Sequence, residues 1–570
     1  MNLAGNPVGA SATTNTFSTS GGATNTITGL LNANNAGVNF NLTSATSGTS
    51  LVDGSFAAIA FTQNTQGGYG LQNAGTVNVT GGGNLLFKDK FGASTLNMNA
   101  GVIQMGDGSA ATTSTTADLI TTNLAIANGA KVIFDRAEAV TNNSAITGSG
   151  SLIQAGIGTL TLTGNSSAFA GSTTVNAGKT LAIGTGGSLG ATGSTLALAD
   201  SAASLLFTEA SGTSIVGSTI SGAGSLSHTG AGTGVLTANN TYSGATTVSG
   251  GTLQIGNATT TGSLGTASGV TLSNNANLAF SRSADTTIDK TISGDGNVTA
   301  NITGNLALTS NIALTGANTI NLTASGSITE TAGSLAATSL YMTATTGNIG
   351  SSAQHIQSNV SSMALTAAGD AFVTEANAVS LAANVGSLDL ATTNGTLNVA
   401  TVNNIGGITA TNGDVTLSGT TDTGIGIYIG NNITANNGTV SITGTTSTAV
   451  NPDAGVRSAA TVSAKNITLL ASATGVGGGA LGYFGAGGYF NATEQLNLTG
   501  TTAGTANGFY SYTGGFTSGT GTTIVGTSAS GQGVGLVNGV TMTNGSTGDI
   551  SITGTATDGT KQGIGLRGIT

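Results

Sequence analysis

The chain has 570 residues, of which 94 are glycine and only 6% are charged, and it contains two histidines and no cysteine. Its formal net charge of −10 is repelled by phosphate backbones, which excludes nucleic-acid binding as a function class. No apolar run approaches the roughly 18 residues that a membrane-spanning helix needs. So few ionisable side chains leave little material for a catalytic centre, and we expect no enzymatic activity, no cofactor and no metal site.

Most of the chain alternates aliphatic residues with Thr, Ser and Asn. Leu160 and Leu162, for example, alternate with threonines over 159–163, which is the period-2 pattern of a half-buried strand. Gly and Asn turns separate these short strands. Coils of parallel strands fit such a pattern, because each coil stacks about 4.8 Å above the one before and like residues lie above like residues. The sequence therefore predicts an all-β fold, a parallel β-helix (β-solenoid) rod.

A long repeat occupies the first half of the chain. Phe61, Phe134, Phe207 and Phe280 are each 73 residues apart and fall at the same point of a repeated stretch of sequence. A fixed period of this kind is typical of stacked-repeat architectures. At roughly 24 residues per coil, one unit would span about three coils.

The pattern changes near residue 300. Later strands are richer in Ala and Leu, and from residue 413 phrases such as GDVTLSGTT recur together with Gly-x-Gly tags. We interpret these stretches as one solenoid with several types of repeat. The predicted segments are an irregular start at 1–60, a β-helix of 73-residue units at 61–300, a β-helix with haemagglutinin-like strands at 301–410, and a β-helix with Gly-rich loops and an aromatic cluster at 411–570.

Residues 222–256 resemble the autotransporter-associated β-strand repeat, also called the passenger-associated transport repeat. That pattern is G-x-G-x-L, then N-T-Y-x-G-x-T-x-V, then G-T-L-x-x-G. The matching residues are Gly222, Gly224, Leu226, Asn240, Thr241, Tyr242, Gly244, Thr246, Val248, Gly251, Thr252, Leu253 and Gly256. A copy at 148–184 has Phe169 in place of Tyr242, and 75–106 is a weaker third copy.

The resemblance implies a right-handed β-helix that is secreted or exposed on a bacterial surface. It also implies export through an outer-membrane translocator, in cis or in trans, that is not part of this chain. The later region, with GNIG at 347–350 and SMALTAA at 362–368, is similar to filamentous-haemagglutinin-like exoproteins. The first 22 residues lack the basic and apolar regions of a secretion signal, so we expect either a longer precursor or an excised piece.

The two histidines are expected at the surface. His228 occupies the position that Gln154 fills one unit earlier, and this exchange is typical of a solvated outward position. His355 lies in the polar stretch SSAQHIQSN. No third partner accompanies them, so a catalytic triad is not expected.

The acidic residues are expected to be balanced by neighbouring bases. Asp285, Asp289 and Asp295 could form a weak oxygen site for a metal, but Arg282 and Lys290 lie among them, so we prefer charge balance. A second run is interpreted in the same way, as a self-neutralised loop: Lys131, Asp135, Arg136 and Glu138.

Aromatic residues concentrate between 483 and 516, surrounded by glycines. Exposed rings on such loops could stack on sugars or form an apolar protein-binding patch, whereas buried rings would fill a wider coil. We prefer the buried arrangement and keep the cluster as the candidate contact surface. Its members are Tyr483, Phe484, Tyr489, Phe490, Phe509, Tyr510, Tyr512 and Phe516.

The leading hypothesis is a non-catalytic adhesin or structural stalk at the bacterial surface, whose host-cell, glycan or bacterial ligand the residues do not identify. The alternative is a self-assembling filament or surface-layer subunit, because open strand edges invite association end to end or side by side. A polysaccharide-degrading β-helix enzyme is a minor alternative.

Overall fold

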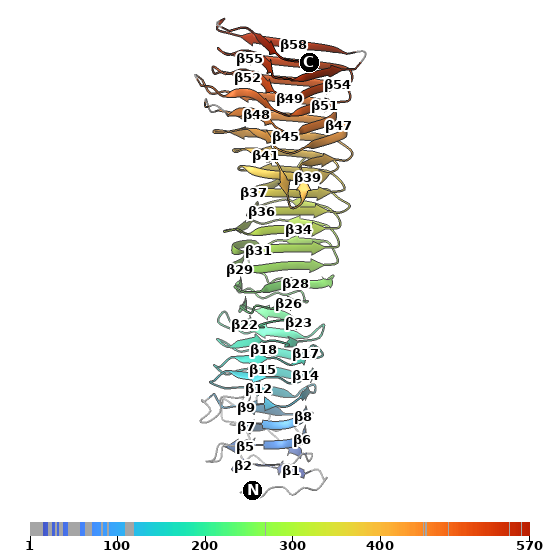
Figure 1. The fold of residues 1–570 in the computed structure, drawn as a ribbon. Helices are drawn as coiled ribbons and strands as arrows, with labels where there is room; N and C mark the ends of the chain where they lie inside the picture. The colour runs from blue at the N-terminus through green and yellow to red at the C-terminus, as the bar shows by residue number, and fades with distance from the viewer. Residues whose placement is uncertain are drawn as a thin grey trace. The chain divides into compact units, whose positions relative to one another are not determined.

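All regular elements among the residues that the structure describes are β-strands (Figure 1). The computed structural model describes residues 119–570 apart from 268, 448–449, 451–452, 477, 546–547 and 560, and, before them, the segments 15–20, 25–28, 31–32, 38–43, 58–62, 71–80, 84–87 and 91–108. The chain divides into two compact units, Met1–Arg282 and Ser283–Thr570. The all-β prediction is confirmed.

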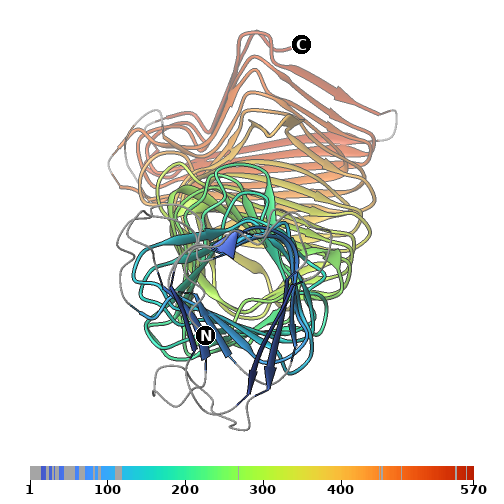
Figure 2. The ribbon, with the colours of Figure 1, turned by 90° about the horizontal axis from the view of Figure 1, so that it is seen from below.

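The first unit is a parallel β-solenoid. Strand β18 (Ser172–Val175) is followed by β19 (Thr180–Ile183) and β20 (Ser188–Leu189), and β21 (Thr195–Leu198) then pairs in parallel with β18. The strands of successive coils therefore surround a common axis (Figure 2). Alternate aliphatic residues point inward and are buried, which is the arrangement that the period-2 pattern predicts.

Three columns of paired residues run through the coils of this unit. The first contains Phe61, Phe87, Met105, Phe134, Gln154, Val175 and Leu198. The second contains Ile183, Phe207, His228, Val248 and Leu272. The third contains Leu189, Val216, Leu236, Ile255 and Phe280.

The 73-residue repeat does not match a whole number of coils throughout. From Phe61 to Phe134 it spans three coils and returns to the first column. Three coils after Phe134 take only 64 residues (198−134), so Phe207 falls nine residues later, in the second column. Phe280 falls in the third column for the same reason. The expectation that one unit equals three coils is therefore correct for the first interval and wrong for the next two.

The second unit is also a parallel solenoid. One inward column joins Leu390, Leu417, Ile442, Leu469, Leu498, Ile524 and Ile552. The strands that carry it are β40 (Leu388–Thr392), β45 (Val415–Thr421), β47 (Ile433–Thr446), β49 (Thr461–Ala473), β52 (Gln495–Thr502), β55 (Gly521–Ser528) and β58 (Asp549–Ala556). Each buried leucine or isoleucine in such a column contributes about 1.5–3 kcal/mol of transfer free energy.

Close contact between two strands of one coil explains why the Thr-Gly-Thr and Gly-x-Gly phrases occur together. Gly526 of β55 faces Gly533, which precedes β56 (Val534–Val537), and a Cβ on Gly526 would lie 1.9 Å from the Gly533 carbonyl oxygen. Gly554 and Gly563 meet in the same way in the next coil, again with 1.9 Å. Only glycine fits at such a contact, so each phrase requires the other.

Candidate functional site

The predicted aromatic cluster divides into an inner and an outer set. It lies on β50 (Leu481–Ala486), β51 (Tyr489–Ala492), β53 (Phe509–Tyr512) and β54 (Gly515–Ser518). The inner rings are at most 1% exposed, and they are Tyr483, Phe490, Phe509 and Phe516.

The inner rings pack against one another inside the solenoid. The Tyr483 and Phe509 rings stack with centroids 4.4 Å apart, and the Phe490 and Phe516 rings stack with centroids 6.1 Å apart. Stacked and tilted pairs of this kind add to the burial energy of large side chains. These four residues fill the core of wide coils, and they do not reach a ligand at the surface.

The outer set includes a row of rings that cover one another. Phe484 and Tyr510 stack with centroids 6.0 Å apart and planes 10° apart. The Arg457 guanidinium of β48 (Ala454–Ser458) lies 5.2 Å from the Phe484 centroid and 5.6 Å from that of Tyr428. A sugar ring needs an open aromatic face, and the faces within this row are turned towards neighbouring rings or towards the guanidinium.

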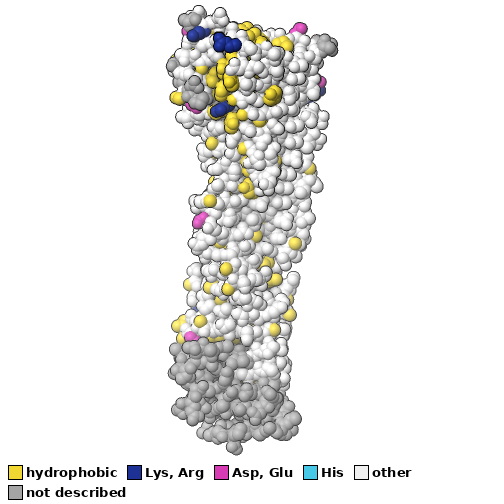
Figure 3. All heavy atoms as spheres, viewed as in Figure 1, with side chains coloured by type: hydrophobic (Ala, Val, Ile, Leu, Met, Phe, Trp, Pro, Cys, Tyr) yellow, Lys and Arg dark blue, Asp and Glu magenta, His cyan; other side chains and the backbone are white. Residues whose placement is uncertain are grey.

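Two tyrosines of the cluster are open to solvent. Tyr489 is 49% exposed and Tyr512 is 46% exposed. They lie in neighbouring coils on either side of one corner, because Tyr512 ends β53 and Tyr489 begins β51, while β51 pairs with β54. Hydrophobic side chains gather in a band over the C-terminal coils, with basic side chains beside it (Figure 3). These two rings are the most open members of the predicted cluster, since Phe484 and Tyr510 are only partly exposed.

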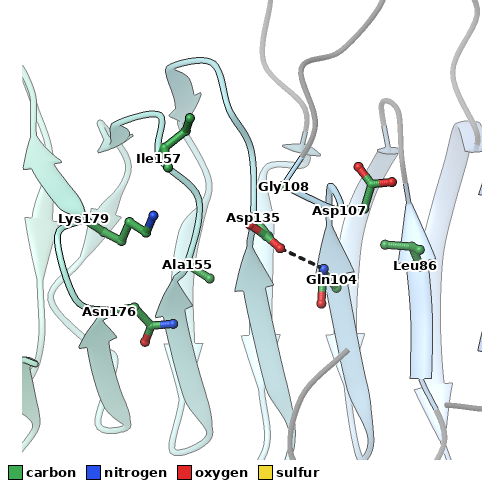
Figure 4. Close-up of a pocket in the computed structure, with 9 residues that line it drawn as sticks. All are labelled: Leu86, Gln104, Asp107, Gly108, Asp135, Ala155, Ile157, Asn176 and Lys179. Carbon is green, nitrogen blue, oxygen red and sulfur yellow. Dashed lines mark hydrogen bonds between the residues drawn. The ribbon is translucent and has the colours of Figure 1, made fainter. Parts of the chain in front are cut away.

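A polar pocket of about 420 Å³ lies on the first unit (Figure 4). Its lining residues are Leu86, Gln104, Asp107, Gly108, Asp135, Ala155, Ile157, Asn176 and Lys179. Gln104 Nε2 donates a hydrogen bond to Asp135 Oδ2 at 3.2 Å, and both side chains are buried. Burial raises the pKa of the Asp135 carboxyl, Asp107 raises it further, and Lys179 opposes both effects. The pocket therefore offers acidic and basic groups to a small polar molecule.

The loop that was expected to neutralise itself does so only in part. Arg136 Nη1 lies 3.8 Å from Glu138 Oε1, as an ion pair. Asp135, in contrast, turns into the pocket, where the uncharged Gln104 amide donates a hydrogen bond to it. Alternation of residues along one strand could not show this, because the pocket joins side chains from several coils.

Glycines allow the coils to approach closely in the stretch from residue 222 to 256. Gly222 has φ +98°, which favours glycine. A Cβ on Gly224 would lie 2.3 Å from the Ala203 carbonyl oxygen, and one on Gly244 would lie 2.2 Å from the Gly224 carbonyl oxygen. Each glycine therefore permits one corner to rest on the corner of the coil before it.

A buried tyrosine ties the same stretch together. Leu226 of β25 (Ser225–His228) pairs with Thr246 of β27 (Thr246–Val248) in the next coil. Tyr242 is fully buried, and its hydroxyl lies 2.8 Å from Thr246 Oγ1. In the earlier copy Phe169 takes the tyrosine position, and Thr173 Oγ1 is buried without a hydrogen-bond partner.

These two stretches match the family model of the passenger-associated transport repeat, at residues 152–183 and 226–255. The chain carries the repeat of autotransporter passengers. This match and the solenoid confirm the resemblance drawn from the sequence, while the likeness of the later region to filamentous haemagglutinins stays a prediction. No curated protein and no solved structure matches the chain. In the described part of the chain, no helix has the length and apolar character to span a membrane.

The surface prediction for His228 is wrong. His228 lies inside the second passenger repeat with no exposed surface, and its Nε2 is 2.7 Å from Oε1 of the equally buried Glu209. Its Nδ1 donates to the Gly250 carbonyl at 2.8 Å. The equivalent Gln154 is buried as well, and its amide donates to the Gly156 and Gly158 carbonyls. The exchange between repeats therefore preserves a buried polar position that reaches backbone carbonyls.

His355 and two of the 285–295 acids contact neighbouring groups of the solenoid. His355 is partly exposed, and its ring lies 5.7 Å from that of Phe372. Asp289 pairs with Lys290 at 3.1 Å. Asp285 accepts a hydrogen bond from the Asn305 backbone at 2.8 Å, which lowers the pKa of Asp285. Among the residues that the structure describes, no three histidine or acidic side chains gather as a metal site.

Proposed function

We propose that this chain is an autotransporter passenger that acts at the bacterial surface as a non-catalytic adhesin or structural stalk. The observation that carries the proposal is the pair of passenger repeats built into a stacked solenoid. Among the conspicuous residues of the repeat, Gly224 and Gly244 let one coil rest on the next, and the Tyr242 hydroxyl bonds Thr246 within its own coil. A scaffold maintained in this way presents its outer surface at a distance from the cell.

Within this proposal, the exposed tyrosines make the contact with the ligand of the adhesin. Tyr489 and Tyr512 combine an apolar ring with a hydroxyl, which suits contact with a glycan or a protein. The export partner would be an outer-membrane translocator, encoded in the same reading frame or separately.

Cell-binding assays test the adhesive part. The protein should bind host cells, a glycan array or other bacteria, or it should promote aggregation of the cells that display it. Replacing Tyr489 and Tyr512 by Ser should reduce that binding at least several-fold. Val476→Ser is the matched control, since Val476 is 82% exposed but lies outside the aromatic cluster. The adhesive role is excluded if the unaltered protein binds none of these targets and causes no aggregation.

Two alternatives predict different results. A filament or surface-layer subunit would form ordered polymers in electron micrographs as its concentration rises, whereas an adhesin would stay monomeric. A polysaccharide-degrading enzyme would release sugars in a substrate screen. Because Asp135 is the buried acid of the polar pocket, Asp135→Asn should abolish such activity if the pocket carries it.

A further inference from the structure

One face of the second unit carries a regular array of small hydroxyl side chains. It is formed by β45, β47, β49, β52, β55 and β58, which follow one another in the stack (Figure 1). Each strand contributes three outward residues at alternate positions. The first row is Thr416, Ser441, Thr468, Asn497, Thr523 and Ser551; the second is Ser418, Thr443, Leu470, Thr499, Val525 and Thr553; the third is Thr420, Thr445, Ser472, Thr501, Thr527 and Thr555.

The array is regular because the strand pairing beneath it is unbroken. From Val415 to Thr421 and on to the last strand, the paired residues follow one another without a shift in register; the one shift between these strands lies earlier, between Ala435 and Thr439. Neighbouring strands lie about 4.8 Å apart, and alternate residues of one strand lie about 6.7 Å apart. The hydroxyls therefore repeat in two directions at fixed spacings.

The array is uncharged and consists mainly of hydroxyl side chains. None of its residues is charged, and all but Asn497, Leu470 and Val525 are Ser or Thr. A threonine side chain is stiff at χ1, so its methyl and hydroxyl are already ordered before a partner arrives. Each hydroxyl donates and accepts a hydrogen bond. Within the described residues, one hydrogen bond joins two array side chains, from Thr501 Oγ1 to Ser472 Oγ at 3.2 Å, so the array does not consume its other hydroxyls.

We infer that this face binds ice. A partner that engages all three rows at once must itself repeat in two dimensions, and the surface of a crystal does so. The two spacings of the array are close to those between oxygen atoms on the prism face of ice. The absence of charge from the rows agrees with a neutral lattice, and pre-ordered hydroxyls lower the entropy lost on binding. This inference goes beyond the proposed adhesive role and does not depend on it.

The aromatic row on a neighbouring face differs from the array in the size and charge of its residues. This row runs through coils of the same stack and consists of Tyr428, Arg457, Phe484 and Tyr510. Its residues differ in size, and one of them is charged. A lattice favours small, uncharged groups that recur at each step, and the hydroxyl array offers Ser or Thr at every position except Asn497, Leu470 and Val525. Leu470, which is 50% exposed, and Val525 interrupt the hydroxyls of the middle row but bring no charge to it.

Ice-recrystallisation assays on the intact purified chain test the inference. Thr443 lies in the middle row and is exposed, so Thr443→Tyr places a bulky ring in the centre of the array. Thr409 is also an exposed strand residue, in β44 (Ile408–Ala410) and outside the array, and Thr409→Tyr is the matched control. Circular dichroism and thermal unfolding verify that both variants fold. If Thr443→Tyr does not fold, Thr499→Tyr in the same row is tested in its place.

The expected result is that the unaltered chain and Thr409→Tyr slow recrystallisation and partition into growing ice. Thr443→Tyr should require at least tenfold more protein for the same effect. The inference is overturned if the unaltered chain has no effect on ice, or if the two variants lose activity equally. Binding to crystalline cellulose or chitin without an effect on ice would also overturn it, and would assign the face to a solid polysaccharide.

Discussion

His228 Nε2 lies 2.7 Å from Glu209 Oε1 within the solenoid, and neither side chain has exposed surface. A polar pair at this depth is stabilising only while both members are present, because each satisfies the other in a medium that solvates charge poorly. The pair also explains how the second passenger repeat accommodates a buried histidine, since Glu209 satisfies the polar side chain of His228.

Removing His228 should therefore destabilise the protein. We expect His228→Ala to lower the free energy of unfolding by about 3 kcal/mol, because it leaves the Glu209 carboxylate buried without this partner. Urea denaturation followed by circular dichroism measures the change. The double variant His228→Ala with Glu209→Ala is the control, and its loss should be smaller than the sum of the two single losses. Additive losses would show that the pair is not coupled.

The tyrosine of the passenger repeat gives a reciprocal test. Tyr242→Phe removes the hydroxyl that meets Thr246 Oγ1 at 2.8 Å, and it should cost about 1 kcal/mol of stability. Phe169→Tyr in the earlier copy should stabilise the protein by a similar amount, because Thr173 Oγ1 is buried without a partner. Thermal unfolding of both variants is the measurement. If the two substitutions change stability with opposite signs, the result supports the same role for Tyr242 and Phe169 in their repeats. Destabilisation by both substitutions contradicts it.

Two glycines of one strand should respond differently to the same substitution. Gly526→Ala places a methyl group 1.9 Å from the Gly533 carbonyl oxygen, so we expect a loss of at least about 2 kcal/mol. Gly521→Ala is the matched control in β55, because its nearest neighbour, the Asp549 carbonyl oxygen, would be 3.5 Å away. Denaturant midpoints of the two variants decide the matter. Equal midpoints would mean that the strand contact is not tight.

Stability should fall as pH rises through the range in which Glu330 would ionise. Burial raises the pKa of Glu330 from 4.5 to about 7, against the opposing effect of the Gln357 backbone N–H. The folded state therefore holds this proton more tightly than the unfolded state does. The contribution of Glu330 is most favourable below about pH 4.5 and is lost between pH 4.5 and about 7.

Glu330→Gln isolates this effect. The variant should match the unaltered protein near pH 4.5 and exceed its unfolding midpoint at pH 8, because the amide does not ionise. Glu375, whose pKa burial also raises, stays in both proteins and cancels in the comparison. Thermal unfolding at several pH values between 4 and 8 gives the curves. Parallel curves for the two proteins would exclude Glu330 as the source of the pH dependence.

The fold was predictable because alternation and stacking are local signals that repeat. Leu160 and Leu162 are buried between outward threonines, as the period of two requires. The same signal placed His228 inside, since it stands two residues after the buried Leu226, but its polar side chain led to the opposite prediction. Periodicity was the better guide, because an inward polar residue can satisfy its hydrogen bonds within the coil.

The candidate site was only partly predictable from the sequence. Neighbours such as Tyr483 and Phe484 must point to opposite sides of a strand, so a cluster counted along the chain necessarily splits between core and surface. The pocket around Asp135 brings together residues from several coils, and its composition depends on coil lengths that vary. The hydroxyl array is different, because its rows are visible once the strands are aligned.

The unequal lengths of the coils also bear on how such a protein can change over generations. A duplicated block of 73 residues in the first unit advances by one column after Phe134, so its outer residues come to face another direction around the axis. Duplication of that block lengthens the unit without repeating a surface. The strands from β45 to β58 recur once per coil and keep their direction. Copying a single coil can therefore extend a binding surface, whereas copying the longer block extends only the scaffold.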